Sequence, residues 1–171
     1  MGLPIVTPDW RWVVEEETTA VDDEGYEFVL QTLQLMTSEN EALAVFLDDL
    51  FTDEDYLNSH PGLVFACQVY RMCWLAARRS NDEMLPQVHE DTLGGLIGEA
   101  ATRQNYFFVT RLRRAMVENP EVFTPLINLA GGWRSLIRQH RDWGMSGLLI
   151  FLALERQLAV KALEKDLAGR I

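Results

Sequence analysis

PGLVFACQVYRMCWLAARR, residues 61–79, is the stretch that decides the fold of this chain. On a helix with 3.6 residues per turn, its apolar side chains fall on nearly every face. A helix with that pattern is usually central in a bundle. Pro61 suits a first helical turn, and Arg78 and Arg79 suit the negative C-terminal end. We therefore predict a central helix from about residue 61, directly after His60, to residue 79.

The sequence on either side predicts further helices. Asp22 and Asp23 are suitable caps for a helix over about 22–36, with Val29, Leu30, Leu33 and Met36 on its inner face. Ser38 and Glu41 form a capping box for the next helix, whose inner face is predicted as Leu43, Phe46, Leu47 and Leu50. A short capped turn or helix is expected at 52–56. Longer helices are expected at about 89–118 and 143–167, with shorter pieces from 119 and over 133–141.

These patterns predict one architecture. We find no alternating strand pattern with hairpin turns, so the class is all-α. A chain of 171 residues can bury a real core in one domain. The expectation is a single-domain helical bundle of five to seven helices over residues 21–171, with its core largely from the 61–79 and 143–167 helices. In the 89–118 helix, Gly94, Gly95 and Gly98 predict a bend or very close packing.

Residues 1–20 are predicted to form an extended N-terminal arm. Pro4 and Pro8 lack the amide donors that a helix needs. Trp10 and Trp12 are candidate anchors of this arm. They either pin it to the protein's own core, or contact a partner or a second copy in a dimer-swapped arm, since tryptophan is a preferred interface anchor.

The charge is distributed very unevenly along the chain. No lysine or arginine lies between Trp12 and Tyr70, while fourteen acids do. Residues 1–70 carry a net charge of −14, and residues 71–171 carry +3. Burying so many carboxylates would cost several kcal/mol each, on the order of the penalty for any buried ion, so most of them must face water or a cation. The sequence therefore predicts an acidic surface that meets a basic partner, and its candidate residues are Glu15, Glu16, Glu17, Asp22, Asp23, Asp48, Asp49, Asp53, Glu54 and Asp55.

A second candidate surface is basic. Arg134, Arg138 and Arg141 stand at i, i+4 and i+7, which predicts one outward stripe. Another three arginines fall within about 80° of one another on the 89–118 helix: Arg103, Arg111 and Arg114. These arginines either neutralise the acidic half within the molecule or form a patch of their own.

The composition argues against several other classes. The N-terminus lacks the basic start and apolar core of a signal peptide. No uncharged apolar run reaches the roughly 20 residues that cross a bilayer. The acidic half would be repelled by anionic lipid and by nucleic acid. Cys67 and Cys73 would not face each other on a helix, so we expect reduced, buried thiols and a cytoplasmic protein.

No catalytic or metal-binding motif is present. The chain has three histidines and no H-E-x-x-H, paired C-x-x-C or G-x-G-x-x-G. His60 and His89 are interpreted as helix-start residues. Gly144-Met-Ser-Gly147 is one residue short of a nucleophile elbow and lacks the preceding strand. We therefore expect no metal, no cofactor and no catalytic residue that local spacing could reveal.

Three classes of function remain. The first is a non-catalytic interaction or regulatory protein, whose sharpest form is a nucleic-acid mimic that inhibits a nucleic-acid-binding protein. The second is a homo-oligomeric helical scaffold or chaperone-like assembly protein. The third is a helical ligand-binding or enzymatic bundle with a dispersed site. The charge asymmetry favours the first class.

Overall fold

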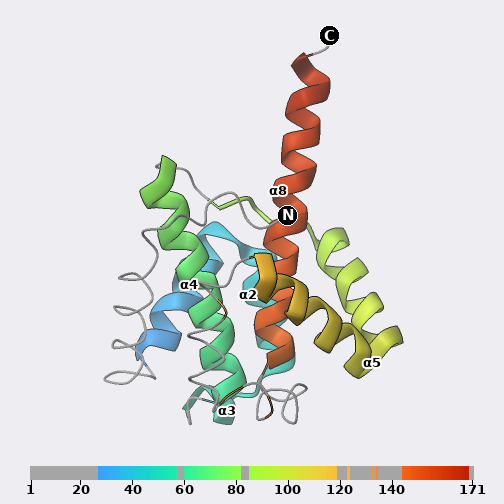
Figure 1. The fold of residues 1–171 in the computed structure, drawn as a ribbon. Coiled ribbons are helices and arrows are strands. Elements are labelled where there is room, and N and C mark those ends of the chain that lie inside the picture. Colours follow the sequence, from blue (N-terminus) through green and yellow to red (C-terminus); the bar gives the residue numbers. More distant parts are fainter. Residues whose placement is uncertain are drawn as a thin grey trace.

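The computed structural model describes residues 27–57, 60–81, 85–118 and 144–169, together with the isolated positions 123, 132 and 134. These residues form helices and connecting segments with no strand among them, which confirms the predicted all-α class (Figure 1). The predicted arm over residues 1–20, with Trp10 and Trp12, lies outside the described residues.

The helices follow the predicted order closely. Residues 27–39 form the first described helix. It is followed by α2 (Glu41–Leu50), α3 (Asp53–Leu57), α4 (Pro61–Asn81), α5 (Glu90–Glu118) and α8 (Met145–Gly169). In the first helix Val29 and Met36 are buried as expected, but Leu30 is 37% exposed. Phe28 and Thr32 are buried in its place, because the buried face of that helix is rotated from the one predicted.

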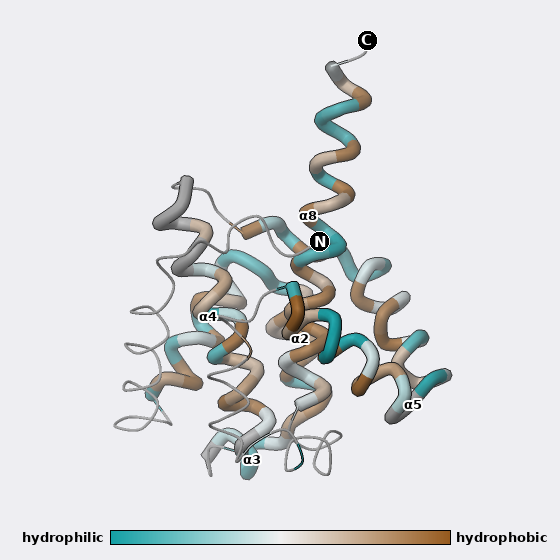
Figure 2. Tube along the Cα trace, in the orientation of Figure 1, coloured by the Kyte–Doolittle hydropathy of each residue, from teal (hydrophilic) through white to brown (hydrophobic). Residues whose placement is uncertain are grey.

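Helices α4 and α8 form the centre of the described bundle. Six consecutive residues of α4, 65–70, are buried, and so are nine consecutive residues of α8, 146–154. Helix α8 packs against both α4 and α5. Figure 2 shows hydrophobic residues recurring along α4 and along the part of α8 that lies beside it. The prediction that these two helices supply much of the core is therefore confirmed. Both cysteines are free and buried on α4.

A glycine permits the close approach of α8 to α4. A Cβ atom at Gly147 would lie 2.5 Å from Cδ1 and 2.6 Å from Cε1 of Phe65. The Phe65 ring is only 1% exposed, so it has little room to move away. Beside this contact, the Ser146 hydroxyl donates a hydrogen bond to the buried carbonyl of Gly62 at 3.2 Å. Gly147 is thus a packing residue of the core and not part of a catalytic turn.

This contact gives a matched pair of substitutions. We expect Gly147→Ala to lower the free energy of unfolding by about 1–3 kcal/mol, because the added methyl group overpacks the core. Gly94→Ala is the control on α5, where an added Cβ atom would meet nothing within 4 Å and the residue is exposed. There, alanine is expected to stabilise the helix by roughly 0.5–1 kcal/mol. Urea unfolding followed by circular dichroism measures both changes in the free energy of unfolding. If both substitutions stabilise the protein, or both destabilise it, this account of the contact is contradicted.

The junction between the first described helix and α2 differs from the prediction. Ser38 lies within the first helix, and Asn40 is the N-cap residue of α2 without a side-chain capping bond. The Asn40 side chain instead donates from Nδ2 to the Pro86 carbonyl at 2.9 Å, and its Oδ1 accepts from the Val88 amide at 3.0 Å. Asn40 is 1% exposed. The predicted capping box at Ser38 is therefore wrong, and a buried amide fixes the segment before α5 to this junction.

The contributions of Ser38 and Asn40 to stability can be compared by experiment. Asn40→Ala should lower the free energy of unfolding by about 1–3 kcal/mol, because it leaves the Val88 amide buried without its acceptor. Ser38→Ala should change it by less than roughly 0.5 kcal/mol, as is usual at exposed positions. Thermal and urea unfolding of both variants checks the contrast. If Ser38→Ala lowered the free energy of unfolding more than Asn40→Ala, the prediction of a capping box at Ser38 would be correct after all.

Helix α5 is bent between Glu99 and Arg111, which is beyond its three glycines, and it does not pack closely at the glycines (Figure 1). Gly94, Gly95 and Gly98 are exposed, and a Cβ atom added at any of them would meet nothing within 4 Å, so the close-packing alternative is wrong. The Thr102 hydroxyl donates to the Gly98 carbonyl four residues earlier at 2.9 Å, a bond that often bends helices. Figure 1 shows α5 as two arms that meet at an angle. The bend matters for the site described below.

Candidate functional site

Acidic side chains gather where α2 ends and α3 begins. Asp48 and Asp49 lie in the last turn of α2, and α3 starts with Asp53, Glu54 and Asp55. The first four of these are exposed and Asp55 is partly exposed. We call these five residues the acidic surface. The structure thus places this half of the predicted acidic set at one site on the outside of the bundle.

Local hydrogen bonds hold the acidic surface in a defined shape. The Thr52 hydroxyl accepts from the Asp55 amide at 3.2 Å, while Asp55 Oδ2 accepts from the Thr52 amide at 2.9 Å. This reciprocal arrangement is a capping box, and it confirms the predicted capped turn. The backbone hydrogen bond from Thr52 lowers the pKa of Asp55. The Tyr56 hydroxyl donates to Asp48 Oδ1, which ties α3 to the end of α2. Burial and the bond to Asp48 raise the pKa of Tyr56.

The charges at the end of α2 oppose the helix dipole. Carboxylates near the negative C-terminus of a helix are unfavourable by roughly 0.3–1 kcal/mol each at low ionic strength. The last turn of α2 holds Asp48 and Asp49 and no basic residue. Helix stability therefore does not account for these two acids, whereas Asp53 and Glu54 are in the favourable first turn of α3. An incoming cation would relieve the repulsion at α2.

Two apolar side chains accompany the acids. Leu50 was predicted to face the core, but it is 52% exposed at the end of α2, so that prediction is wrong. The helix ends at Leu50 and the chain turns away through Phe51, which is partly buried against the core instead. Val45, one turn before Asp49 on the same helix, is 49% exposed. Exposed apolar residues beside charged ones are a common composition of protein-binding surfaces.

Several other predicted site residues lie outside the part of the chain that the structure describes. They are Glu15, Glu16, Glu17, Asp22 and Asp23 of the acidic set, and Arg138 and Arg141 of the basic stripe. Arg134 is described and exposed. The stripe of three arginines therefore stays a prediction.

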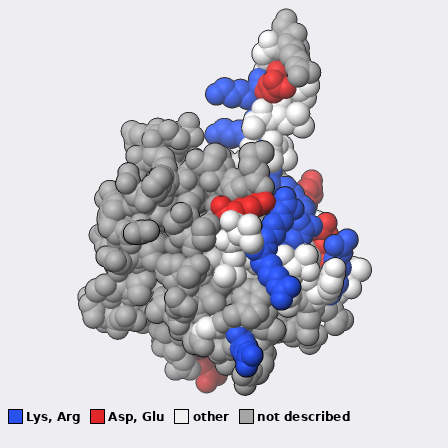
Figure 3. Space-filling model, viewed as in Figure 1, with Lys and Arg blue, Asp and Glu red and all other residues white. Residues whose placement is uncertain are grey.

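Two arginines of α5 pair with acids of their own helix. Arg114 pairs with Glu118 at 3.3 Å, and Arg111 pairs with Glu99 at 3.9 Å, all within α5. Arg138, Arg141 and the acids before residue 27 lie outside the described residues, so the alternative in which the arginines neutralise the acidic half within the molecule stays a prediction. Figure 3 shows Lys and Arg side chains gathering where α5 and α8 meet, on the face drawn there.

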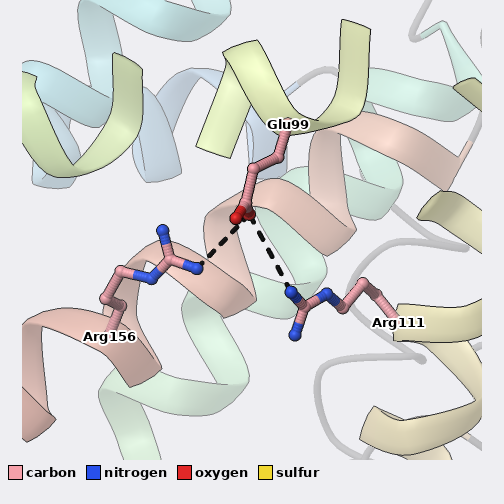
Figure 4. Close-up of polar contacts among 3 residues, drawn as sticks. All are labelled: Glu99, Arg111 and Arg156. Carbon is pink, nitrogen blue, oxygen red and sulfur yellow. Dashed lines mark hydrogen bonds and ion pairs between the residues drawn. The ribbon is translucent and has the colours of Figure 1, made fainter. Parts of the chain in front are cut away.

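Glu99 is the centre of an ion-pair cluster that the sequence did not reveal. Its Oε2 atom lies 3.9 Å from Nη2 of Arg111 and 3.4 Å from Nη2 of Arg156 on α8 (Figure 4). In a straight helix, residues 99 and 111 would be about 18 Å apart along the axis. The bend of α5 brings them together. Arg111 also lies over the Phe107 ring, with its guanidinium carbon 5.7 Å from the ring centre, which helps to orient it.

A groove of about 300 Å³ opens beside this cluster, between α5 and α8. Three arginines and Glu155 line it together with apolar residues: Leu96, Arg111, Arg114, Leu152, Glu155, Arg156 and Ala159. Glu155 Oε2 is buried without a hydrogen-bond partner. Burial, reinforced by Glu118, raises the pKa of Glu155, while Arg114 and Arg111 oppose the rise. The groove therefore combines several cationic donors with a carboxyl group that holds its proton more strongly than usual.

The described segments also hold histidine, cysteine and carboxylate side chains outside the acidic surface and the groove. No group of three or more His, Cys, Asp or Glu side chains in these segments could hold a metal ion. His60 accepts from the Gly62 amide through Nδ1 at 3.0 Å and so caps α4, as predicted for a helix-start residue. Burial raises the pKa of Cys73 to about 12 and also raises that of Cys67, which makes both thiols poor nucleophiles.

No helix in the described segments has both the length and the apolar character to cross a bilayer. Comparison of the chain with protein-family models, with curated proteins and with solved structures gave no match.

Proposed function

We propose that this protein is a non-catalytic interaction or regulatory protein that binds a basic partner protein through its acidic surface. The observation that carries the proposal is the exposure of Asp48, Asp49, Asp53 and Glu54 at the junction of α2 and α3. Among the described residues, no lysine or arginine is paired with any of the four. A basic partner would supply the missing cations and would be steered by the field of the acidic half.

The shape of the acidic surface supports the proposal further. The capping box at Thr52 and the bond between Tyr56 and Asp48 orient the acids before a partner arrives. Less side-chain ordering is then required on binding, which favours affinity. Val45 and Leu50 offer apolar contact area beside the charges.

In its sharpest form the proposal makes the protein a nucleic-acid mimic. Carboxylates held on helices would occupy a groove that a nucleic-acid-binding protein keeps for phosphates, and so inhibit it. Such a partner already carries the arginine and lysine side chains that acids attract. The net charge of −14 over residues 1–70 supports this form, since it gives the acidic half the sign of a nucleic acid.

The test reverses charge without disturbing the local structure. Asp49 and Glu54 are exposed, and the bonds of the capping box and of the Tyr56 hydroxyl are made by Thr52, Asp55 and Asp48 instead. We expect Asp49→Lys/Glu54→Lys to abolish capture of the basic partner from a lysate of the native host, as measured by affinity capture and mass spectrometry. Partner retention by the unaltered protein should fall steeply as salt rises.

The matched control carries the same change of charge elsewhere. Glu90→Lys/Glu164→Lys alters exposed acids of α5 and α8 and should keep the partner. If the Asp49/Glu54 variant stays folded and retains the same partners at physiological salt, the acidic-surface proposal is wrong. Competition of the captured partner with duplex DNA then separates the mimic from an ordinary acidic interface, since only the mimic is displaced by DNA.

One observation favours self-assembly as a second candidate function. The end of α8, residues 159–169, is exposed throughout and projects from the bundle in Figure 1. Val160, Leu163 and Leu167 recur on it at three- and four-residue spacing and are 38%, 58% and 51% exposed. This is the seam spacing of paired helices.

If the second candidate holds, light scattering of the purified protein should give a mass above the 19.6 kDa of one chain. Leu163→Glu/Leu167→Glu should then return the mass to that of a monomer, because charges would replace the apolar seam. A monomeric mass for the unaltered protein across a range of concentrations would exclude assembly through α8.

A further inference from the structure

The groove between α5 and α8 presents more hydrogen-bond donors than the protein itself uses. A guanidinium carries five N–H donors. Arg156 and Arg111 are both directed at a single atom, Oε2 of Glu99. Arg114, the third arginine of the groove, pairs with Glu118 through Nε at 3.3 Å and is 57% exposed on its side chain. Within the part of the chain that the structure describes, each of the three guanidinium groups therefore uses only some of its N–H donors.

The contacts of Glu99 are long for ion pairs. Tight charge-assisted bonds between a guanidinium and a carboxylate measure about 2.7–2.9 Å. The two distances at Glu99 are 3.4 Å and 3.9 Å, and its side chain is 39% exposed. A loosely held, solvent-accessible carboxylate can be displaced by a better anion. Glu99 thus occupies the place of an anionic group, but it does not satisfy the arginines around it.

The remaining wall of the groove is apolar. Leu96, Leu152 and Ala159 line it beside the arginines. At about 300 Å³ the groove is at the lower end of the range for small-molecule sites. Glu155 Oε2, which is buried in this wall, has no hydrogen-bond partner.

We propose that this groove is a binding site for a small anion, in which Arg111, Arg114 and Arg156 hold a phosphate or carboxylate head group and the leucines contact a short apolar body. Glu99 is then a positioning residue: it keeps Arg111 and Arg156 converged while the site is empty and gives way when the anion enters. The site is separate from the acidic surface and does not depend on the proposed function.

The probe is phenyl phosphate, titrated into the full chain by isothermal calorimetry at constant ionic strength. We expect saturable binding that is tighter than that of inorganic phosphate, because the apolar body adds contact area.

Arg156→Gln should weaken the affinity for phenyl phosphate by about tenfold or more, the cost of one lost bond to a charged group. Glu99→Gln should strengthen it, since the competing charge is removed. Benzoate serves as the parallel arm, and the tighter of phenyl phosphate and benzoate identifies a phosphate or a carboxylate as the preferred head group.

Matched variants separate the site from general charge attraction. Arg103→Gln removes the same charge from an exposed position on α5 outside the groove and should leave affinity unchanged. Arg156→Lys keeps the charge but lacks the planar fork, so it should give intermediate affinity, and unfolding curves verify that each variant folds. The proposal is overturned if neither probe binds saturably to the unaltered or Glu99→Gln protein. It is also overturned if Arg103→Gln weakens binding as much as Arg156→Gln, or if phenyl phosphate binds no better than inorganic phosphate.

Discussion

The contact between Gly147 and Phe65 sets the distance between the two helices on which the described bundle depends. Because α8 lacks a side chain there, the ring of Phe65 lies directly against its backbone. Helix α8 can then bury nine consecutive residues and still present Gln157 to α5. The side-chain Oε1 of Gln157 accepts from the His89 backbone amide and from the Thr92 hydroxyl, both at 3.1 Å, and so caps the start of α5. The position of α5, and with it the arginine groove, follows from the approach of α8 to α4.

The shape of helix α5 determines which charged residues meet at the arginine groove. A threonine hydroxyl bonded to the Gly98 carbonyl favours a bend. The bend brings residues 99 and 111 together on one side of the helix, where Arg156 of α8 meets them. The bend of α5 therefore decides which charges are neighbours. The acidic surface needs no such bend, because its members are close in sequence and α3 is tied to α2 by Tyr56.

The sequence predicted what depends on local periodicity and missed what depends on distant partners. The all-round apolar pattern of residues 61–79 identified α4, and the cost of burying carboxylates predicted that Asp48, Asp49, Asp53 and Glu54 would be exposed. Ser38 has good local capping chemistry, yet Asn40 is the residue at the start of α2. Its side-chain amide bonds two backbone groups that are more than forty residues away in the sequence. Glu99 and Arg156 could not be paired from sequence, since their distance depends on the bend of α5 and on its packing against α8.

The projecting end of α8, residues 159–169, keeps its helical structure without burial against the rest of the bundle. A short helix in water is marginal, because the first turn must be nucleated at a cost that later turns only slowly offset. The exposed turns of residues 159–169 have their nucleus in the buried turns that precede them. They need only add hydrogen bonds one by one to an existing helix. This end can therefore fray or rewind turn by turn while the core remains intact, so its helical content responds to temperature and solvent separately from global unfolding.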